Sequence, residues 1–129
     1  MATRVDISEK TRSHLARWYG DNLPGQVTVL RGSLIGTLFG LSGQAAVTIN
    51  KTIHMTPEAS DLDTDRGIAL LGHELYHVLQ QTDMGWIDFM LKYLAGWRPT
   101  HIKDGWRHPM ERPAYDRGHE IRESLRQDG

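Results

Sequence analysis

The sequence predicts an α+β fold, in which a short β-sheet packs on one central helix with two or three further helices around it. A largely apolar run of helical length lies near the middle of the chain, over residues 63–82. Short β-prone segments precede it within residues 26–56, and two further helical patterns follow it, over residues 85–97 and 109–126. Together these segments indicate a small sheet with helices packed against it.

The length and composition fit one globular domain, residues 1–129. The chain has 129 residues, enough to bury a core of its own, with 39% hydrophobic and 24% charged residues. Its net charge of −1 argues against a general binder of nucleic acid or of acidic membranes. No stretch approaches the roughly 18 apolar residues of a membrane span. The N-terminus has no apolar run, so we expect no secretory signal and a cytoplasmic protein by default.

Residues 1–25 predict an N-terminal helix and a turn. Asp6 and Glu9 are spaced as a variant of the capping box, so the helix is expected to begin near Asp6. Gly20 is expected to end the helix. Pro24 lies in the turn that follows.

Residues 26–56 carry the β-prone segments. Residues 26–31 form one short segment, and residues 45–55 read as strand, bend and strand, with Asn50-Lys51 at the bend. The glycine-spaced stretch over residues 32–43 is expected to be a loop that connects them.

The central apolar run predicts a helix over residues 63–82. The acidic residues Asp61, Asp63 and Asp65 lie at its beginning, where carboxylates cap free N–H groups and complement the helix dipole. The helix is expected to end before Gly85, which offers a left-handed cap.

Residues 73–77 of this helix form an HExxH motif, His73-Glu74-Leu75-Tyr76-His77. Residues four apart share one face of a helix, so the two imidazoles can converge on a single metal ion. Glu74 leans toward the same ion without binding it, where it can take a proton from a bound water. This pattern is typical of a zinc hydrolase. Because the chain has no cysteine, histidine and carboxylate must hold any zinc ion.

A tetrahedral zinc ion with two histidine ligands needs a third protein ligand. Asp83 could reach the ion only if the helix unwound before it. Glu111, near the start of the helix predicted over residues 109–126, is the better candidate, since two histidines and one glutamate leave a fourth position open for water. His108 and His119 are its competitors.

The two remaining helical patterns differ in character. Residues 85–97 place aromatic and aliphatic side chains at helical spacing, and the simplest interpretation is a helix that packs back onto the motif helix. A helix that lies on a membrane surface is the alternative. Residues 109–126 carry a charged face that we interpret as solvated surface.

The segment over residues 70–81, with the letters LLGHELYHVLQQ, resembles the metallopeptidase-like domain DUF4157. That domain is found in bacterial proteins associated with extracellular contractile injection systems, and its signature reads HELxHVxQQ. The strand predicted over residues 45–50 resembles the strand that precedes the helix in this family. Residues 85–94 and 108–111 resemble short free-standing members. In its size and in its pattern of an HExxH motif plus one glutamate, the chain is also similar to the minigluzincins, which are compact peptidases.

The resemblance implies a zincin-like fold with one zinc ion per chain, held by His73, His77 and Glu111. It implies Glu74 as the general base of a gluzincin-type zinc metalloendopeptidase that acts on a peptide or protein substrate. It also implies association with a larger secretion or injection assembly. The expected location is then the bacterial cytoplasm, with export that needs no signal as the alternative.

Two positions depart from the pattern of the family. Pro113 stands where a glutamate is usual, and because proline is tolerated only in the first turn, the last helix must begin near residues 109–112. Tyr115 stands where gluzincins commonly place an aspartate that orients a histidine ligand. Either Tyr115 or Asp116 is expected to orient the histidine ligand instead.

In the catalytic interpretation, a substrate strand adds to the sheet edge formed by residues 45–50. The oxyanion needs a donor besides zinc, and the candidates are Tyr115, His108 and Arg112.

A non-enzymatic interpretation competes with the catalytic one. In it, zinc stabilises an accessory or cargo-associated module of a larger assembly. Such a site needs the two histidines and Glu111 but no carboxylate at position 74, so Glu74 favours catalysis. A further alternative is a latent enzyme whose charged tail, residues 117–129, covers the cleft.

Overall fold

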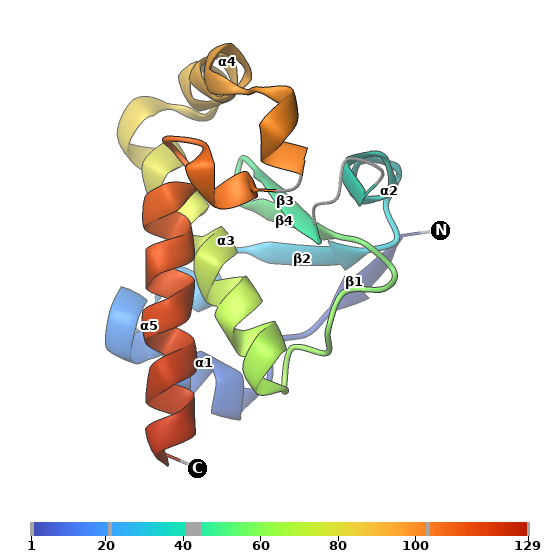
Figure 1. Cartoon of the computed structure of the whole chain (residues 1–129). Helices are drawn as coiled ribbons and strands as arrows, with labels where there is room; N and C mark the ends of the chain where they lie inside the picture. Colours follow the sequence, from blue (N-terminus) through green and yellow to red (C-terminus); the bar gives the residue numbers. More distant parts are fainter. Residues whose placement is uncertain (1, 21, 41–44, 103, 129) are drawn as a thin grey trace.

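The computed structural model describes residues 2–20, 22–40, 45–102 and 104–128. It shows a small α+β fold in which helix α3 (Asp65–Met84) lies between a four-stranded sheet and helix α5 (Arg112–Asp128) (Figure 1). The α+β prediction is therefore confirmed. Side chains from the sheet and from three helices form one core: Leu15, Val29, Ile53, Met55, Leu71, Leu75, Val78 and Ile121.

The sheet is mixed, with the strand order β1-β2-β4-β3. Its strands are β1 (Thr3–Val5), β2 (Thr28–Arg31), β3 (Ala46–Ile49) and β4 (Thr52–Met55). β2 pairs with β1 antiparallel and with β4 parallel, and β4 pairs with β3 antiparallel. β3 therefore forms one edge of the sheet among the described residues. Strand β1 was not predicted, because three residues are too short to show an alternating pattern.

A two-residue turn joins β3 to β4, at the bend predicted from the sequence. Asn50 has a φ of 48° and Lys51 a φ of 66°. A tight hairpin turn of type I′ needs positive φ at both central positions, and asparagine adopts it readily. The register of the hairpin places Thr48 opposite Ile53.

Helix α1 (Glu9–Tyr19) begins later than predicted. Ser8 is the N-cap, and its Oγ accepts the backbone N–H of Thr11 at 3.2 Å. The predicted start near Asp6 and the capping box of Asp6 with Glu9 are therefore wrong, since the chain leaves β1 at Val5 and a serine takes the capping position. The 3-10 helix η1 (Leu23–Gly25) forms the predicted turn that follows.

The stretch over residues 32–43, expected to be a loop, contains a helix. Helix α2 (Leu34–Gly40) begins after Ser33, whose Oγ accepts the N–H of Gly36 at 3.1 Å. A Cβ added at Gly36 would lie 2.8 Å from the carbonyl oxygen of Met55. This glycine thus allows a close approach of the helix to β4 and does not mark a loop. Residues 41–43 lie outside the described part of the chain.

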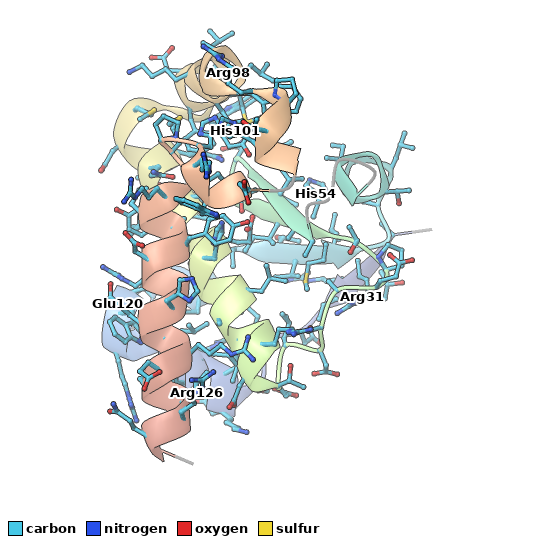
Figure 2. The ribbon with its side chains drawn as sticks, in the orientation of Figure 1. Arg31, His54, Arg98, His101, Glu120 and Arg126 are labelled. Carbon is cyan, nitrogen blue, oxygen red and sulfur yellow. The ribbon has the colours of Figure 1, made fainter. Side chains whose placement is uncertain are left out.

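Helix α3 contains the HExxH motif at its centre. Its N-cap is Thr64, whose Oγ1 accepts the N–H of Gly67 at 3.1 Å, and it ends at Gly85 with a φ of 84°. A ψ of 140° shows that Gly85 has positive φ without the left-handed helical conformation that we expected. Arg31, labelled in Figure 2, holds the loop before this helix by donating hydrogen bonds to the carbonyls of Thr56, Pro57, Ala59 and Ser60.

Helix α4 (Trp86–Gly96) follows α3 directly and buries Phe89 and Tyr93. Two 3-10 helices, η2 (Pro99–Ile102) and η3 (Gly105–Arg107), lead to α5. Pro113 lies in the first turn of α5, as proline requires. Among the described residues, no helix is both long and apolar enough to cross a membrane.

Helix α5 is part of the core over most of its length. Ile121 and Leu125 are buried in the core together with residues of α1 and α3, and they lie within residues 117–128 of the tail that we had considered as a removable cover. Trimming that tail would expose core side chains, so the structure gives no support to a latent enzyme that its removal activates.

Candidate metal centre

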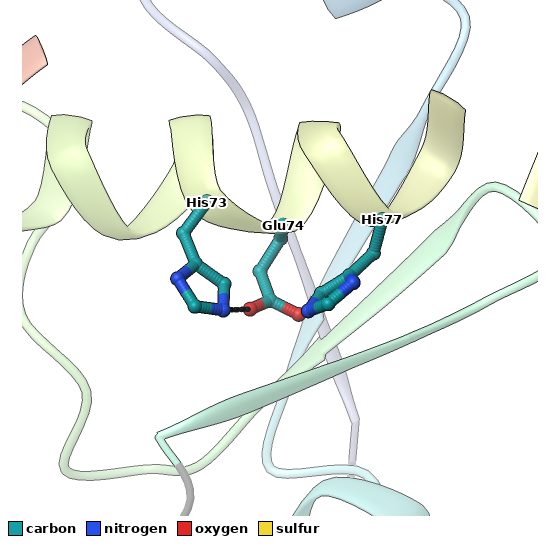
Figure 3. A group of neighbouring side chains, drawn as sticks. All are labelled: His73, Glu74 and His77. Atoms are coloured by element: carbon teal, nitrogen blue, oxygen red, sulfur yellow. Dashed lines mark ion pairs between the residues drawn. The ribbon is translucent and has the colours of Figure 1, made fainter. Parts of the chain in front are cut away.

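Three side chains of the motif project from one face of α3 and lie close together. Figure 3 shows His73, Glu74 and His77 projecting from the helix on the side of the β3–β4 hairpin. All three are buried, and atoms that could bind a metal lie within 4.8 Å of one another. Helical spacing produces this convergence without help from the rest of the fold.

Glu111, which lies outside α3, contacts both imidazoles. It lies in the turn before α5, and its Oε1 is 2.9 Å from Nε2 of His73 and 2.6 Å from Nε2 of His77. Glu111 is 7% exposed. The structure therefore brings together the three residues that the sequence singled out as metal ligands.

This set of donor atoms fits a zinc ion. Bond lengths of about 2.0–2.1 Å to nitrogen and oxygen place tetrahedral ligand atoms about 3.3 Å apart. The Glu111 oxygen already lies within 2.9 Å of both imidazole nitrogens. Two neutral imidazoles and one carboxylate leave a net charge of +1 on a zinc site. They also leave the fourth position open for water.

The same contacts shift the pKa values of His77 and Glu111. Burial lowers the pKa of His77, but the hydrogen bond to Glu111 and its charge outweigh burial and raise the pKa to about 9. Burial raises the pKa of Glu111, and the hydrogen bonds from His73 and His77 outweigh it and hold this pKa well below its usual range. The contact with Glu111 therefore favours protonated His77, and a cation that bound this imidazole would release the proton.

Tyr93 and His108 support Glu111, and neither was expected to do so. The Tyr93 hydroxyl donates to Oε2 of Glu111 at 2.7 Å, and the rings of Tyr93 and His108 stack with centroids 4.1 Å apart. His108 donates from Nε2 to the Tyr93 carbonyl and accepts the N–H of Met110 at Nδ1. Both nitrogens of His108 are thus occupied, so His108 provides neither a metal ligand nor an oxyanion donor in this arrangement.

Two glutamines that follow the motif hold the neighbouring segments. Gln80 accepts from Nδ1 of His77 at 2.7 Å and donates to the carbonyl of Met110 at 3.1 Å. Gln81 donates to the carbonyl of Thr48 at 2.7 Å and accepts the N–H of Asn50 at 2.8 Å. The pair QQ was visible in the sequence, but only the fold reveals what each amide contacts.

Glu74 faces an open cavity and does not reach across to Glu111. The hydroxyl of Thr48 donates to its Oε1 at 3.0 Å, while its Oε2 lies 3.7 Å from Nε2 of His73. The cavity has a volume of about 250 Å³ and is lined by Ala45, Ala46, Leu70, His73, Glu74, Glu111 and Tyr115. A water molecule fits here with polar partners on several sides.

The other candidates take separate positions. The Tyr115 ring packs edge-to-face on His73, with centroids 4.5 Å apart, whereas Asp116 is exposed. Tyr115, and not Asp116, therefore contacts a histidine of the site. Arg112 is exposed, and His119 lies further along α5, where it lines a different hollow.

A comparison with protein families matches the N-terminal and central parts of the chain. The family described as the eCIS core domain matches residues 6–85, from before α1 to the end of α3. The matched region is more than half of the chain and includes the HExxH motif, while Glu111 lies beyond it. Comparison with curated proteins and with solved structures returned no match.

Proposed function

Because the chain belongs to the eCIS core domain family, which is associated with extracellular contractile injection systems, we propose that it is a zinc-dependent peptidase acting in that context. The observation that carries the proposal is the arrangement around α3. His73, His77 and Glu111 converge on one point, and Glu74 faces a cavity beside them without joining them. A zincin-like peptidase of the gluzincin type needs this division between ligands and base.

Glu74 is the proposed general base. Thr48 holds one oxygen of the carboxylate, which leaves the other free to accept a proton from water in the cavity and to return it to the leaving amine. A bound zinc ion would supply Lewis-acid chemistry, polarising the scissile carbonyl and lowering the pKa of water toward about 7. Gln80 and Tyr93 would keep His77 and Glu111 in orientation.

The edge of the sheet suggests where a peptide lies. On the edge of β3, the side chain of Gln81 already forms hydrogen bonds with the carbonyl of Thr48 and the N–H of Asn50. Backbone groups two residues apart in a strand point to the same side, so those of Ala46 face the same free edge. Ala46 also lines the cavity beside Glu74. We therefore place the substrate strand alongside Ala46.

Two variants test this function. Wild-type protein should hold one zinc ion per chain and cleave a generic peptide. Glu74→Gln should keep the zinc ion and lose cleavage, because the amide cannot accept the proton. Glu111→Ala should lose most of the zinc. Elemental analysis and a peptide-cleavage assay give both readouts, and an active Glu74→Gln protein would refute the role of Glu74.

A second function is a zinc-stabilised accessory or cargo-associated module without catalysis. Membership of the eCIS core domain family favours it, because the family itself points to an assembly and not to a reaction. Zinc binding together with stabilisation, but without cleavage of any peptide, would support this alternative.

A further inference from the structure

We propose that a basic groove next to the metal centre binds an acidic side chain of the substrate, so that the enzyme prefers peptides with aspartate or glutamate near the cleaved bond. This inference rests on the proposed peptidase function and specifies its substrate class. The groove lies between α3 and α5 and has a volume of about 200 Å³. Three residues, Leu70, His73 and Tyr115, line both this groove and the cavity beside Glu74. The two hollows therefore adjoin, with Tyr115 at their boundary.

Small side chains leave room for the groove. Ala69 and Gly118 belong to its lining, on α3 and α5 respectively. A Cβ added at Gly118 would lie 3.5 Å from the carbonyl oxygen of Ala69 and 3.7 Å from Cβ of His73. The two helices thus come close together at the base of the groove, and the longer side chains around it form its walls.

The charged residues in the walls are all cationic or able to become so. Arg66 comes from α3, and His119 and Arg122 come from α5, while no aspartate or glutamate lines the groove. Within the described part of the chain, no ion pair engages Arg66 or Arg122. The whole chain has a net charge of −1, so this concentration of positive charge does not reflect a basic protein.

A carboxylate should bind in this groove more tightly than a neutral amide of the same shape. Two guanidinium groups from opposite walls can donate charge-assisted hydrogen bonds to one carboxylate, and guanidinium forks match its geometry. A substrate strand alongside Ala46 passes the cavity of Glu74, and the groove begins on the far side of His73 and Tyr115. Because the two hollows adjoin at Leu70, His73 and Tyr115, a substrate side chain near the cleaved bond can extend from the cavity toward the groove.

The experiment uses fluorogenic peptides that differ only by one glutamate or glutamine, placed in turn at each position around the cleaved bond. At one of these positions, kcat/KM of the zinc-loaded wild-type chain should favour the glutamate peptide by about tenfold, which is 1.4 kcal/mol. Raising salt from about 0.05 M to about 0.5 M should shrink the ratio, because ions screen the attraction.

Matched variants locate the effect. Arg66→Gln combined with Arg122→Gln should bring the ratio of kcat/KM close to one. Arg122→Glu should shift the preference toward a third peptide that carries lysine at the same position. Arg126→Gln is the control, since Arg126 lies outside the groove on the same helix, pairs with Glu123 and is 66% exposed (Figure 2). This control should keep the wild-type ratio.

The outcomes separate the two proposals. Equal cleavage of the glutamate and glutamine peptides at every position overturns the acidic preference and leaves the peptidase standing. If neither peptide is cleaved, the peptidase proposal fails. Fluorescence anisotropy of the labelled peptides then tests whether the groove binds an acidic side chain. Tighter binding of the glutamate peptide, lost in the double variant, then supports the groove, and equal binding overturns it.

Discussion

Replacing Glu111 by glutamine should remove most of the stabilisation that zinc gives to this protein. An ion that binds only the folded state at about 100 times its Kd stabilises that state by about 2.7 kcal/mol. The entropy of unfolding of 129 residues is about 0.27 kcal/mol per kelvin, so the wild-type Tm should rise by about 10 °C on adding zinc. Loss of one charged ligand weakens binding by about 100-fold or more, and the same zinc concentration then raises Tm by only about 1–2 °C.

Thermal unfolding with zinc and with excess chelator measures this difference directly. Glutamine keeps the shape of Glu111 and can still accept a hydrogen bond from Tyr93, so the fold should persist without zinc. Glu120→Gln is the matched control, since Glu120 is exposed on α5, the helix that begins just after Glu111 (Figure 2), and contacts only Arg117 among the ion pairs of the described residues. Equal zinc shifts in the wild type and in Glu111→Gln would show that Glu111 is not a ligand. The absence of a shift in the wild type would refute the metal centre itself.

Three further predictions concern supporting residues. Tyr93→Phe removes the hydroxyl that holds Glu111 at 2.7 Å, so zinc affinity should fall by about 10- to 100-fold in a competitive titration, and unchanged affinity would contradict that support. Arg31→Lys loses the forked donor that binds four loop carbonyls, so urea unfolding should show a loss of about 1–2 kcal/mol; a loss within error of zero would argue that water replaces the contacts. Hydrogen bonds from Ser8 and Thr11 lower the pKa of Asp63, so this carboxylate stabilises the fold above its unfolded pKa of about 3.9, and the stabilisation disappears as pH falls through the lower folded value. Asp63→Asn should therefore be less stable than the wild type at about pH 7 and lose less stability between about pH 4 and about pH 2, as urea unfolding at each pH will show.

The features that could be predicted from the sequence depend on neighbours along the chain. The HExxH spacing places His73, Glu74 and His77 on one helical face wherever the helix lies, because the period of the helix is local. Pro113 restricts the start of α5 in the same way, since its ring permits only the first turn. The hairpin turn at Asn50-Lys51 also follows from local backbone preference.

Errors in the prediction arose where a contact between distant segments decides the conformation. Gly36 was one reason to expect a loop, yet it lets α2 approach the carbonyl of Met55 in β4. The start of α1 follows β1, a strand that exists only because Val5 and its neighbours pair with β2. Such pairings cannot be read from a window of a few residues.

The sequence by itself determined a motif helix with two histidines and a glutamate between them, and it predicted Glu111 as a third ligand with His108 and His119 as competitors. Only the tertiary structure shows what each of these three residues contacts. The turn before α5 brings Glu111 against both imidazoles, while His108 bonds to Tyr93 and Met110 and His119 faces the groove. The physical reason is that helix periodicity acts within one element, whereas a carboxylate on a second element reaches the site only through the packing of α3, α4 and α5.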